Sequence, residues 1–210
     1  MNDSIRIRSR GYLPHWERDG ATYFITFGTA DSLPSLVIER MRSERDSILQ
    51  TASQFRRTLT ASEECHLDQL KAVDRYLDIG HGACVLRRAD NARIVTSALQ
   101  YFDGQRYELL AWCVMPNHVH VVMRVLPRFE LSQVLHSWKS FSAKKINAVL
   151  RATGEFWRHE YYDHLVRNDA DLDRVMDYVA QNPLQAGLRN WPHVWSDPDR
   201  SLAGGTPAVP

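Results

Sequence analysis

The chain has 210 residues, with 26 basic and 25 acidic side chains and a formal net charge of +1. Hydrophobic residues make up 44% and charged residues 24%, which is typical of a globular domain and excludes a collagen-like or wholly disordered chain. No apolar run approaches the ~20 residues of a membrane helix, and the three cysteines are scattered, so we expect a cytoplasmic protein with no membrane partner. The near-neutral charge does not exclude nucleic acid, because a local basic patch matters more than the sum.

The first half of the chain predicts one strand and several helices. Residues 1–20 are polar and basic and predict an N-terminal arm. A strand is expected over 22–28, where β-branched and aromatic residues end at a glycine. Residues 36–104 predict mostly helix, since apolar residues recur at helical spacing, including a helix that starts near residue 60.

The second half predicts an antiparallel hairpin followed by helices. Two strands over 107–126 flank the tight connection Pro116-Asn117, and strands this close pair antiparallel. A helix is expected over 131–150, and the aromatic-rich segment 156–167 can hold a short strand. The last helix is expected to begin at Asn168 or Asp169 and to end near Asn182, before Pro183.

This order of elements predicts an α+β fold in which helices cover one antiparallel sheet. We expect a single domain over 21–190 that includes a helical insertion at 36–104. The remaining residues, 191–210, are expected to form a C-terminal tail, because their last part is rich in Pro, Gly and Asp.

The sharpest local pattern is His118-Val119-His120 on the second strand of the hairpin. Residues i and i+2 of a strand face the same side, so the two imidazoles lie side by side while Val119 points to the opposite face. Two converging ring nitrogens suit one divalent ion. An isolated H-x-H pattern is more often a pair of structural histidines, and the motif alone leaves both interpretations open.

A second pair lies on the last helix, where Tyr178 and Asn182 are one turn apart on the flank of the buried stripe. An amide oxygen is a plausible ligand for Mg²⁺ or Mn²⁺, and a phenol beside a metal ion can act as a nucleophile. The alternative is a tyrosine that packs its ring at the core boundary and an asparagine that ends the helix.

Basic residues concentrate at the N-terminus and over 132–167, where tryptophan and tyrosine side chains are interleaved with them. Basic groups neutralise phosphates and aromatic rings stack on unpaired bases, although a solvated helix face with ordinary core aromatics would look similar. The candidate DNA-binding residues are Arg6, Arg8, Arg10, Lys139, Lys144, Lys145, Arg158 and Arg167.

Four segments, in this order, resemble the single-tyrosine HUH transposases, named for the pattern His, hydrophobic, His. Residues 111–120 contain that pattern, residues 135–141 and 156–167 resemble the next two blocks, and residues 177–187 resemble the tyrosine block. Within this family the chain is most similar to the REP-associated tyrosine transposases. These are bacterial chromosomal proteins linked to repetitive extragenic palindromes.

The resemblance implies a ferredoxin-like antiparallel sheet with the His pair on a central strand. It implies Mg²⁺ or Mn²⁺ held by His118, His120 and Asn182, and Tyr178 as the nucleophile. The implied partner is single-stranded or hairpin DNA of the REP palindrome type, cut and rejoined through a 5′-phosphotyrosine. The resemblance also implies a protein of the bacterial cytoplasm, associated with the nucleoid, that acts as a monomer or homodimer.

Two other functions remain open on the sequence. One is a domesticated hairpin-DNA-binding protein that no longer cleaves. The other is a zinc hydrolase built on His118 and His120, which would need a further ligand such as Asp163 or His164.

Overall fold

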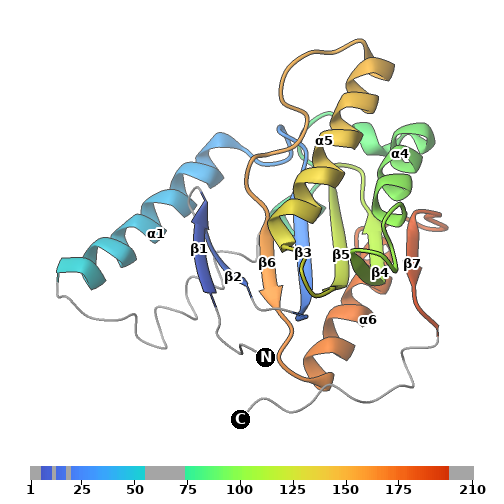
Figure 1. Ribbon diagram of the computed structural model, residues 1–210. Coiled ribbons are helices and arrows are strands. Elements are labelled where there is room, and N and C mark those ends of the chain that lie inside the picture. The colour runs from blue at the N-terminus through green and yellow to red at the C-terminus, as the bar shows by residue number, and fades with distance from the viewer. Residues whose placement is uncertain (1–5, 11–12, 18–19, 55–73, 199–210) are drawn as a thin grey trace.

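The computed structural model describes residues 6–10, 13–17, 20–54 and 74–198. Its centre is a five-stranded antiparallel sheet in the order β6-β3-β5-β4-β7, which confirms the predicted α+β class (Figure 1). The strands are β3 (Thr22–Gly28), β4 (Tyr107–Val114), β5 (His118–Val125), β6 (Tyr162–Leu165) and β7 (Val194–Ser196).

The predicted hairpin is formed by β4 and β5, and it places β5 in the middle of the sheet. The backbone N–H of Met115 donates to the carbonyl of His118 at 2.8 Å, which closes the tight turn at Pro116-Asn117. On its other side β5 pairs with β3, which puts His120 next to Thr26 and His118 next to Gly28. Strand β5 is therefore enclosed by neighbours on both edges.

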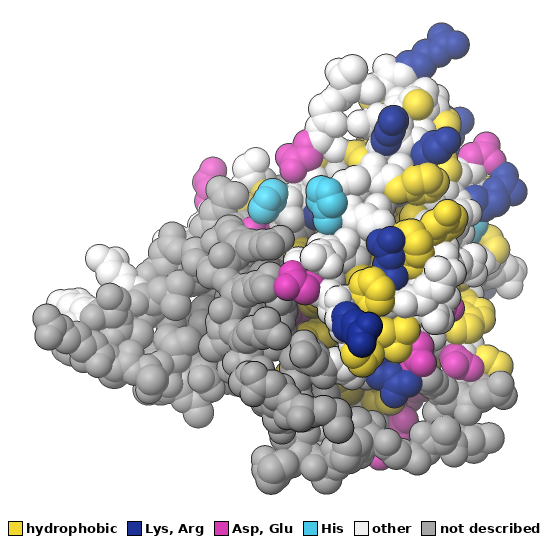
Figure 2. All heavy atoms as spheres, viewed as in Figure 1, with side chains coloured by type: hydrophobic (Ala, Val, Ile, Leu, Met, Phe, Trp, Pro, Cys, Tyr) yellow, Lys and Arg dark blue, Asp and Glu magenta, His cyan; other side chains and the backbone are white. Residues whose placement is uncertain are grey.

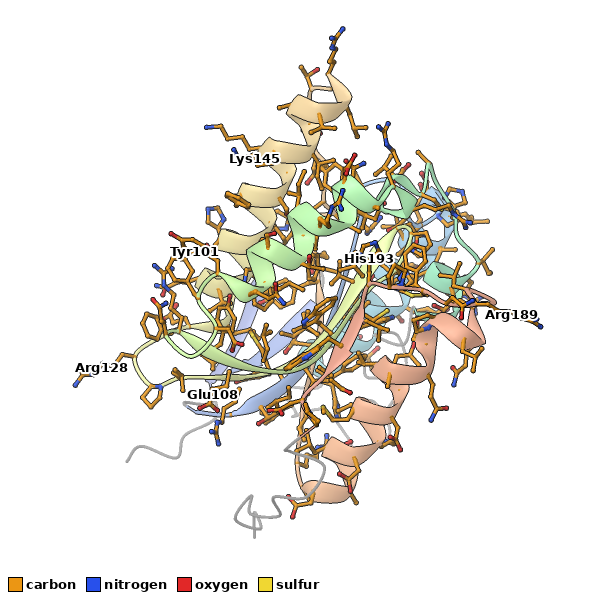
Figure 3. All side chains as sticks on the ribbon, turned by 90° about the vertical axis from the view of Figure 1, so that its right-hand side faces the viewer. Tyr101, Glu108, Arg128, Lys145, Arg189 and His193 are labelled. Atoms are coloured by element: carbon orange, nitrogen blue, oxygen red, sulfur yellow. The ribbon has the colours of Figure 1, made fainter. Side chains whose placement is uncertain are left out.

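Helices cover the two faces of the sheet unequally, as Figure 3 shows. Helices α4 (Ala89–Gln100) and α5 (Leu131–Leu150) pack on one face, where Val119 and Val121 meet Trp138 in the main core. Helix α6 (Asp169–Gln185) packs on the other face, where Val122 joins Val175 in a smaller cluster. The alternation predicted for β5 is thus confirmed, and both histidines lie on the α6 face.

The segment 36–104 has two different parts. Helix α1 (Ser35–Gln54) leads away from the β6 edge of the sheet, whereas α4 buries an apolar face in the main core (Figure 1). Between them lie the short helix α3 (Asp74–Asp78) and the 3-10 helix η1 (Val85–Arg87). The helix predicted to start near residue 60 falls outside the described residues. No helix in the described ranges is long and apolar enough to cross a membrane.

The ends of the chain contribute strands that the sequence did not predict. Within the expected N-terminal arm, β1 (Arg6–Arg10) pairs antiparallel with β2 (Leu13–Glu17). Within the expected C-terminal tail, β7 pairs with β4, and the indole N–H of Trp191 donates to the carbonyl of Val114 at 2.8 Å. The described part of that tail is therefore held to the sheet.

Helix α6 begins as predicted, with the side chain of Asn168 accepting a hydrogen bond from the backbone N–H of Asp171 at 2.9 Å. The prediction that it ends before Pro183 was wrong, because it continues to Gln185. Pro183 lies buried in the last turn of the helix, where the hydrogen bond lost with its missing N–H is tolerated near the helix end.

Candidate functional site

The two histidines at the start of β5 are completely buried, and their rings converge. The Nε2 atoms of His118 and His120 lie 2.9 Å apart, and the ring planes are nearly perpendicular, at 80°. An octahedral ion with ligand bonds of about 2.1 Å holds adjacent ligand atoms about 3 Å apart. The spacing of the two nitrogens therefore fits one shared divalent ion.

Asn117 fixes the tautomer of His118. The side-chain amide of Asn117 donates to the carbonyl of His81 at 2.9 Å, and a carbonyl can only accept. The oxygen of that amide must therefore face His118, whose Nδ1 lies 2.7 Å away and has to carry the proton that it donates. In the neutral ring this leaves the lone pair on Nε2, the atom that points to His120.

His120 is oriented by two residues of the neighbouring strand β3. Its Nδ1 lies 2.9 Å from the hydroxyl of Thr26, and the ring of Phe24 stacks on it at 5.7 Å between centroids. Burial lowers the pKa of His120 to about 4 and that of His118 well below its ordinary value, in the latter case with help from the neighbouring ring. Both imidazoles are neutral at pH 7, as metal ligands must be.

Helix α6 brings the predicted tyrosine to the same place. The ring centroid of Tyr178 lies 5.3 Å from that of His120, with the planes at 77°, and Phe24 contacts both rings. Asn182 follows one turn later on the same flank of the helix and is completely buried. Neither the nitrogen nor the oxygen of its side-chain amide has a hydrogen-bond partner among the described residues. Coordination of a metal ion by the amide oxygen would give this buried polar atom a partner.

A third titratable residue, which the sequence did not identify, lies beside the pair. The Oδ1 atom of Asp78 is 3.6 Å from Nε2 of His118, and the candidate ligand atoms of Asp78, His118 and His120 all lie within 4.8 Å of one another. This is the cluster of His, Cys, Asp and Glu side chains in the described part of the chain whose ligand atoms are close enough together to hold a metal ion. Asp78 is 40 positions from His118, and no spacing in the sequence connects them.

The structure does not bring the predicted zinc ligands to this cluster. The ring of His164 lies 2.7 Å from the carboxylate of Asp171, at the start of α6, and that contact accounts for its orientation. Asp163 is buried on β6, which is separated from β5 by β3. The carboxylate beside the His pair, among the described residues, is that of Asp78.

The predicted DNA-binding residues have different surroundings. Lys139 donates to the backbone carbonyl of His159 at 2.9 Å, and Arg158 is buried. Lys144 and Lys145 are exposed on α5, where Figure 2 shows Lys and Arg side chains among hydrophobic ones. Helix α5 covers the face of the sheet opposite the His pair. DNA that contacted both α5 and the two histidines would therefore have to pass around an edge of the sheet. Arg167 is exposed before α6, and Arg6, Arg8 and Arg10 lie on β1.

Comparison with known proteins agrees with this geometry. A family model described as IS200-like transposase matches residues 83–182, a range that contains the His pair, Tyr178 and Asn182. Residues 83–182 are thus similar to an IS200-like transposase domain, as the sequence resemblance predicted.

The relatives within that class are REP-associated tyrosine transposases. The chain is 26% identical over 90 residues to the one from Escherichia coli, covering 41% of this chain and 52% of that protein. It is 27% identical over 105 residues to a Haemophilus influenzae protein provisionally given the same name, covering 41% and 57%. The chain thus spans a little over half the length of these relatives.

A solved structure shows the same fold over most of the chain. It is the structure of a REP-associated tyrosine transposase bound to a REP hairpin. It matches with a TM-score of 0.51 and 15% identity, covering 89% of this chain and 80% of that one. The likeness establishes the arrangement of strands and helices, including elements outside residues 83–182.

Proposed function

We propose that this protein is a metal-dependent single-strand DNA endonuclease and strand transferase that acts on palindromic or hairpin DNA. The observation that carries the proposal is the contact of Tyr178 with His120, next to a buried His pair whose Nε2 atoms converge. The metal ligands would be His118, His120 and Asn182, and Tyr178 would be the nucleophile. The transposase domain over residues 83–182 and the relatives above support this assignment.

The chemistry follows from the residues. A bound Mg²⁺ or Mn²⁺ would neutralise charge on a non-bridging phosphate oxygen. The phenolic oxygen of Tyr178 attacks phosphorus and loses its proton, while the bond from phosphorus to the 3′ oxygen breaks and that oxygen takes up a proton. The products are a 5′-phosphotyrosine and a free 3′-OH. Attack by another 3′-OH reverses the step without ATP, because the phosphodiester is retained in the new bond.

The proposed DNA partner is a hairpin with a single-stranded flank, by analogy with the related transposase solved on a REP hairpin. The exposed pair Lys144 and Lys145 is a candidate contact, and Lys145 also lies 6.0 Å from the ring of the half-exposed Phe141. Cations beside an exposed ring suit a nucleic-acid strand. Substituting both lysines by alanine should weaken hairpin binding and reduce its salt dependence, by up to about 0.9 in the log–log slope per lost phosphate contact.

The test is a cleavage assay with labelled single-stranded DNA that contains a palindrome, in the presence of Mn²⁺. We expect the wild-type protein to form a covalent adduct that survives denaturation, and Tyr178→Phe to form none while it still binds the hairpin. Tyr161→Phe is the matched control, because Tyr161 is a buried tyrosine of the predicted aromatic segment and its loss should leave the adduct in place.

An adduct that persists in Tyr178→Phe would exclude Tyr178 as the nucleophile. Hairpin binding by the wild-type protein, with no adduct in Mn²⁺ or Mg²⁺, would instead favour the cleavage-inactive DNA-binding protein. Stoichiometric zinc in the purified protein would favour a hydrolase.

A further inference from the structure

We propose that Asp78 supplies the anionic ligand of the divalent-ion site, in addition to His118, His120 and Asn182; the inference rests on the proposed function. The carboxylate lies 3.6 Å from Nε2 of His118 and belongs to the same cluster of ligand atoms. Asp78 lies before residue 83, outside the part of the chain that matches the transposase family model. The ligand would therefore come from helix α3, outside the matched family segment.

The hydrogen bonds of Asn117 leave Nε2 as the nitrogen of His118 that faces Asp78. Because Nδ1 of His118 donates to Asn117, the neutral ring presents a lone pair on Nε2. A carboxylate oxygen that faces a lone pair is repelled by it, whereas a cation held between the two would attract both. The approach of Asp78 to this nitrogen is what an ion-binding site requires.

Helix α3 is held against the sheet at its C-terminal end. Leu77, the residue before Asp78, is buried with Leu33 and Tyr162. The backbone N–H of Gly80 donates to the carbonyl of Leu77 at 2.9 Å and ends the helix. Gly28, the neighbour of His118 on β3, has no side chain, and a Cβ there would lie 3.4 Å from Leu77 and 2.4 Å from the hydroxyl of Ser32. Because Gly28 has no side chain, helix α3 can pack against this end of β3.

The loop that follows α3 is fastened at three points. The ring of His81 donates to the carbonyl of Asp31 at 2.8 Å, and the backbone N–H of Ala83 donates to the Asp31 carboxylate at 2.7 Å. The carbonyl of His81 accepts from Asn117, the residue that also orients His118. One asparagine thus connects the loop that follows Asp78 to the first histidine ligand.

The donor set fits the class of ion already proposed. Two imidazoles and a carboxylate hold divalent ions while leaving positions open, and an amide and a phosphate oxygen are suitable for those positions. Among the described residues, Asp78 contributes the carboxylate of this cluster, and the other two members are imidazoles. Beside two buried rings a carboxylate contributes to affinity for the cation.

The experiment measures Mn²⁺ binding without DNA, by titration of the electron paramagnetic resonance signal of free Mn²⁺. We expect Asp78→Asn and Asp78→Ala to raise the dissociation constant at least tenfold. Asp171→Asn is the matched control, because it removes a half-buried aspartate near the start of α6, and we expect it to bind Mn²⁺ as the wild type does.

Thermal unfolding separates ligation from folding. The unfolding temperatures of the wild type and Asp78→Asn without metal give the effect of the substitution on folding alone. With Mn²⁺, the wild type should gain stability and the variant should gain much less. If Asp78→Asn bound Mn²⁺ with the wild-type dissociation constant, the proposed role of Asp78 would be wrong, and the proposal for the other ligands would be unaffected. Failure of the wild-type protein to bind Mn²⁺ would overturn this inference together with the proposed metal site.

Discussion

Asn117 determines which nitrogen of His118 is available, and it does so from the tight turn between β4 and β5. Its amide joins the carbonyl of His81 to Nδ1 of His118, so one side chain orients a ring and holds a loop. Groups that orient a metal-binding histidine in this way affect affinity although they do not touch the ion.

Replacing Asn117 with alanine should therefore reduce both metal binding and stability. We expect the Mn²⁺ dissociation constant to rise about 10- to 100-fold, and the free energy of unfolding to fall by about 1–3 kcal/mol as buried partners are lost. Asn91→Ala is the matched control, because Asn91 is also buried and donates to the carbonyl of Val85, but it belongs to α4, which packs on the face of the sheet opposite the His pair. Equal losses of metal affinity in the two variants would contradict the orienting role of Asn117.

Lys139 gives a prediction about pH. Burial lowers the pKa of Lys139 from 10.5 to about 8, although Glu155 and Glu160 act in the opposite direction. Between about pH 8 and 10.5 the unfolded chain keeps the proton that the folded protein has lost, so this residue makes the protein more stable as the pH rises through that window.

Melting temperatures from pH 7.5 to 10.5 test this for the wild type and for Lys139→Met. The wild type should gain stability relative to Lys139→Met as the pH increases, while the exposed Lys145→Met should run parallel to the wild type. Parallel curves for all three proteins would show that Lys139 titrates normally.

At the scale of elements, the loop after α3 depends on one glycine. Gly82 has a φ of +89°, and a Cβ there would lie 2.6 Å from the backbone oxygen of Asp31. We expect Gly82→Ala to lower the free energy of unfolding by more than about 1 kcal/mol and to weaken Mn²⁺ binding by displacing Asp78.

Gly104→Ala is a close control for this change. Gly104 has a similar φ of +73° but open space around the position of a Cβ, so it reproduces the backbone strain without the contact. Chemical denaturation and Mn²⁺ titration of the two variants should differ. If Gly104→Ala were equally harmful to metal binding, the packing of Gly82 on Asp31 would not be the cause.

The elements also explain how much of the site could be predicted from the sequence. The convergence of His118 and His120 follows from the two-residue period of a strand, and it is found. The helical repeat places Tyr178 and Asn182 one turn apart, and both lie on α6. Asp78 could not be predicted, because its position depends on the burial of Leu77 and on contacts with a loop far away in the sequence. Strand β7 was missed because three residues show no periodicity, and its pairing with β4 alone defines it.

At the scale of the whole molecule, β7 protects β4 from being an edge strand. Besides the ladder, the backbone N–H of Val114 donates to the carbonyl of His193 at 2.9 Å, and that of Asp197 donates to the carbonyl of Leu110 at 2.8 Å. A chain that ends at residue 190 should therefore be less stable and should self-associate through β4. A chain that ends at residue 198, which keeps β7, should remain like the wild type.

Size-exclusion chromatography with light scattering, together with thermal unfolding, distinguishes these chains. A chain ending at residue 190 with the mass and melting temperature of the longer one would mean that β7 adds nothing to the sheet.

The pairing of β3 with β5 has a consequence for biosynthesis. Thr26 and His120 contact each other across 94 positions, and Tyr178 reaches His120 only after α6 has been made. Contacts between residues so distant in sequence form late in folding and slow it. A chain still on the ribosome can hold both histidines without the tyrosine. The proposed nucleophile is therefore synthesised after both histidines, and a chain that ended before residue 178 would carry the His pair without it.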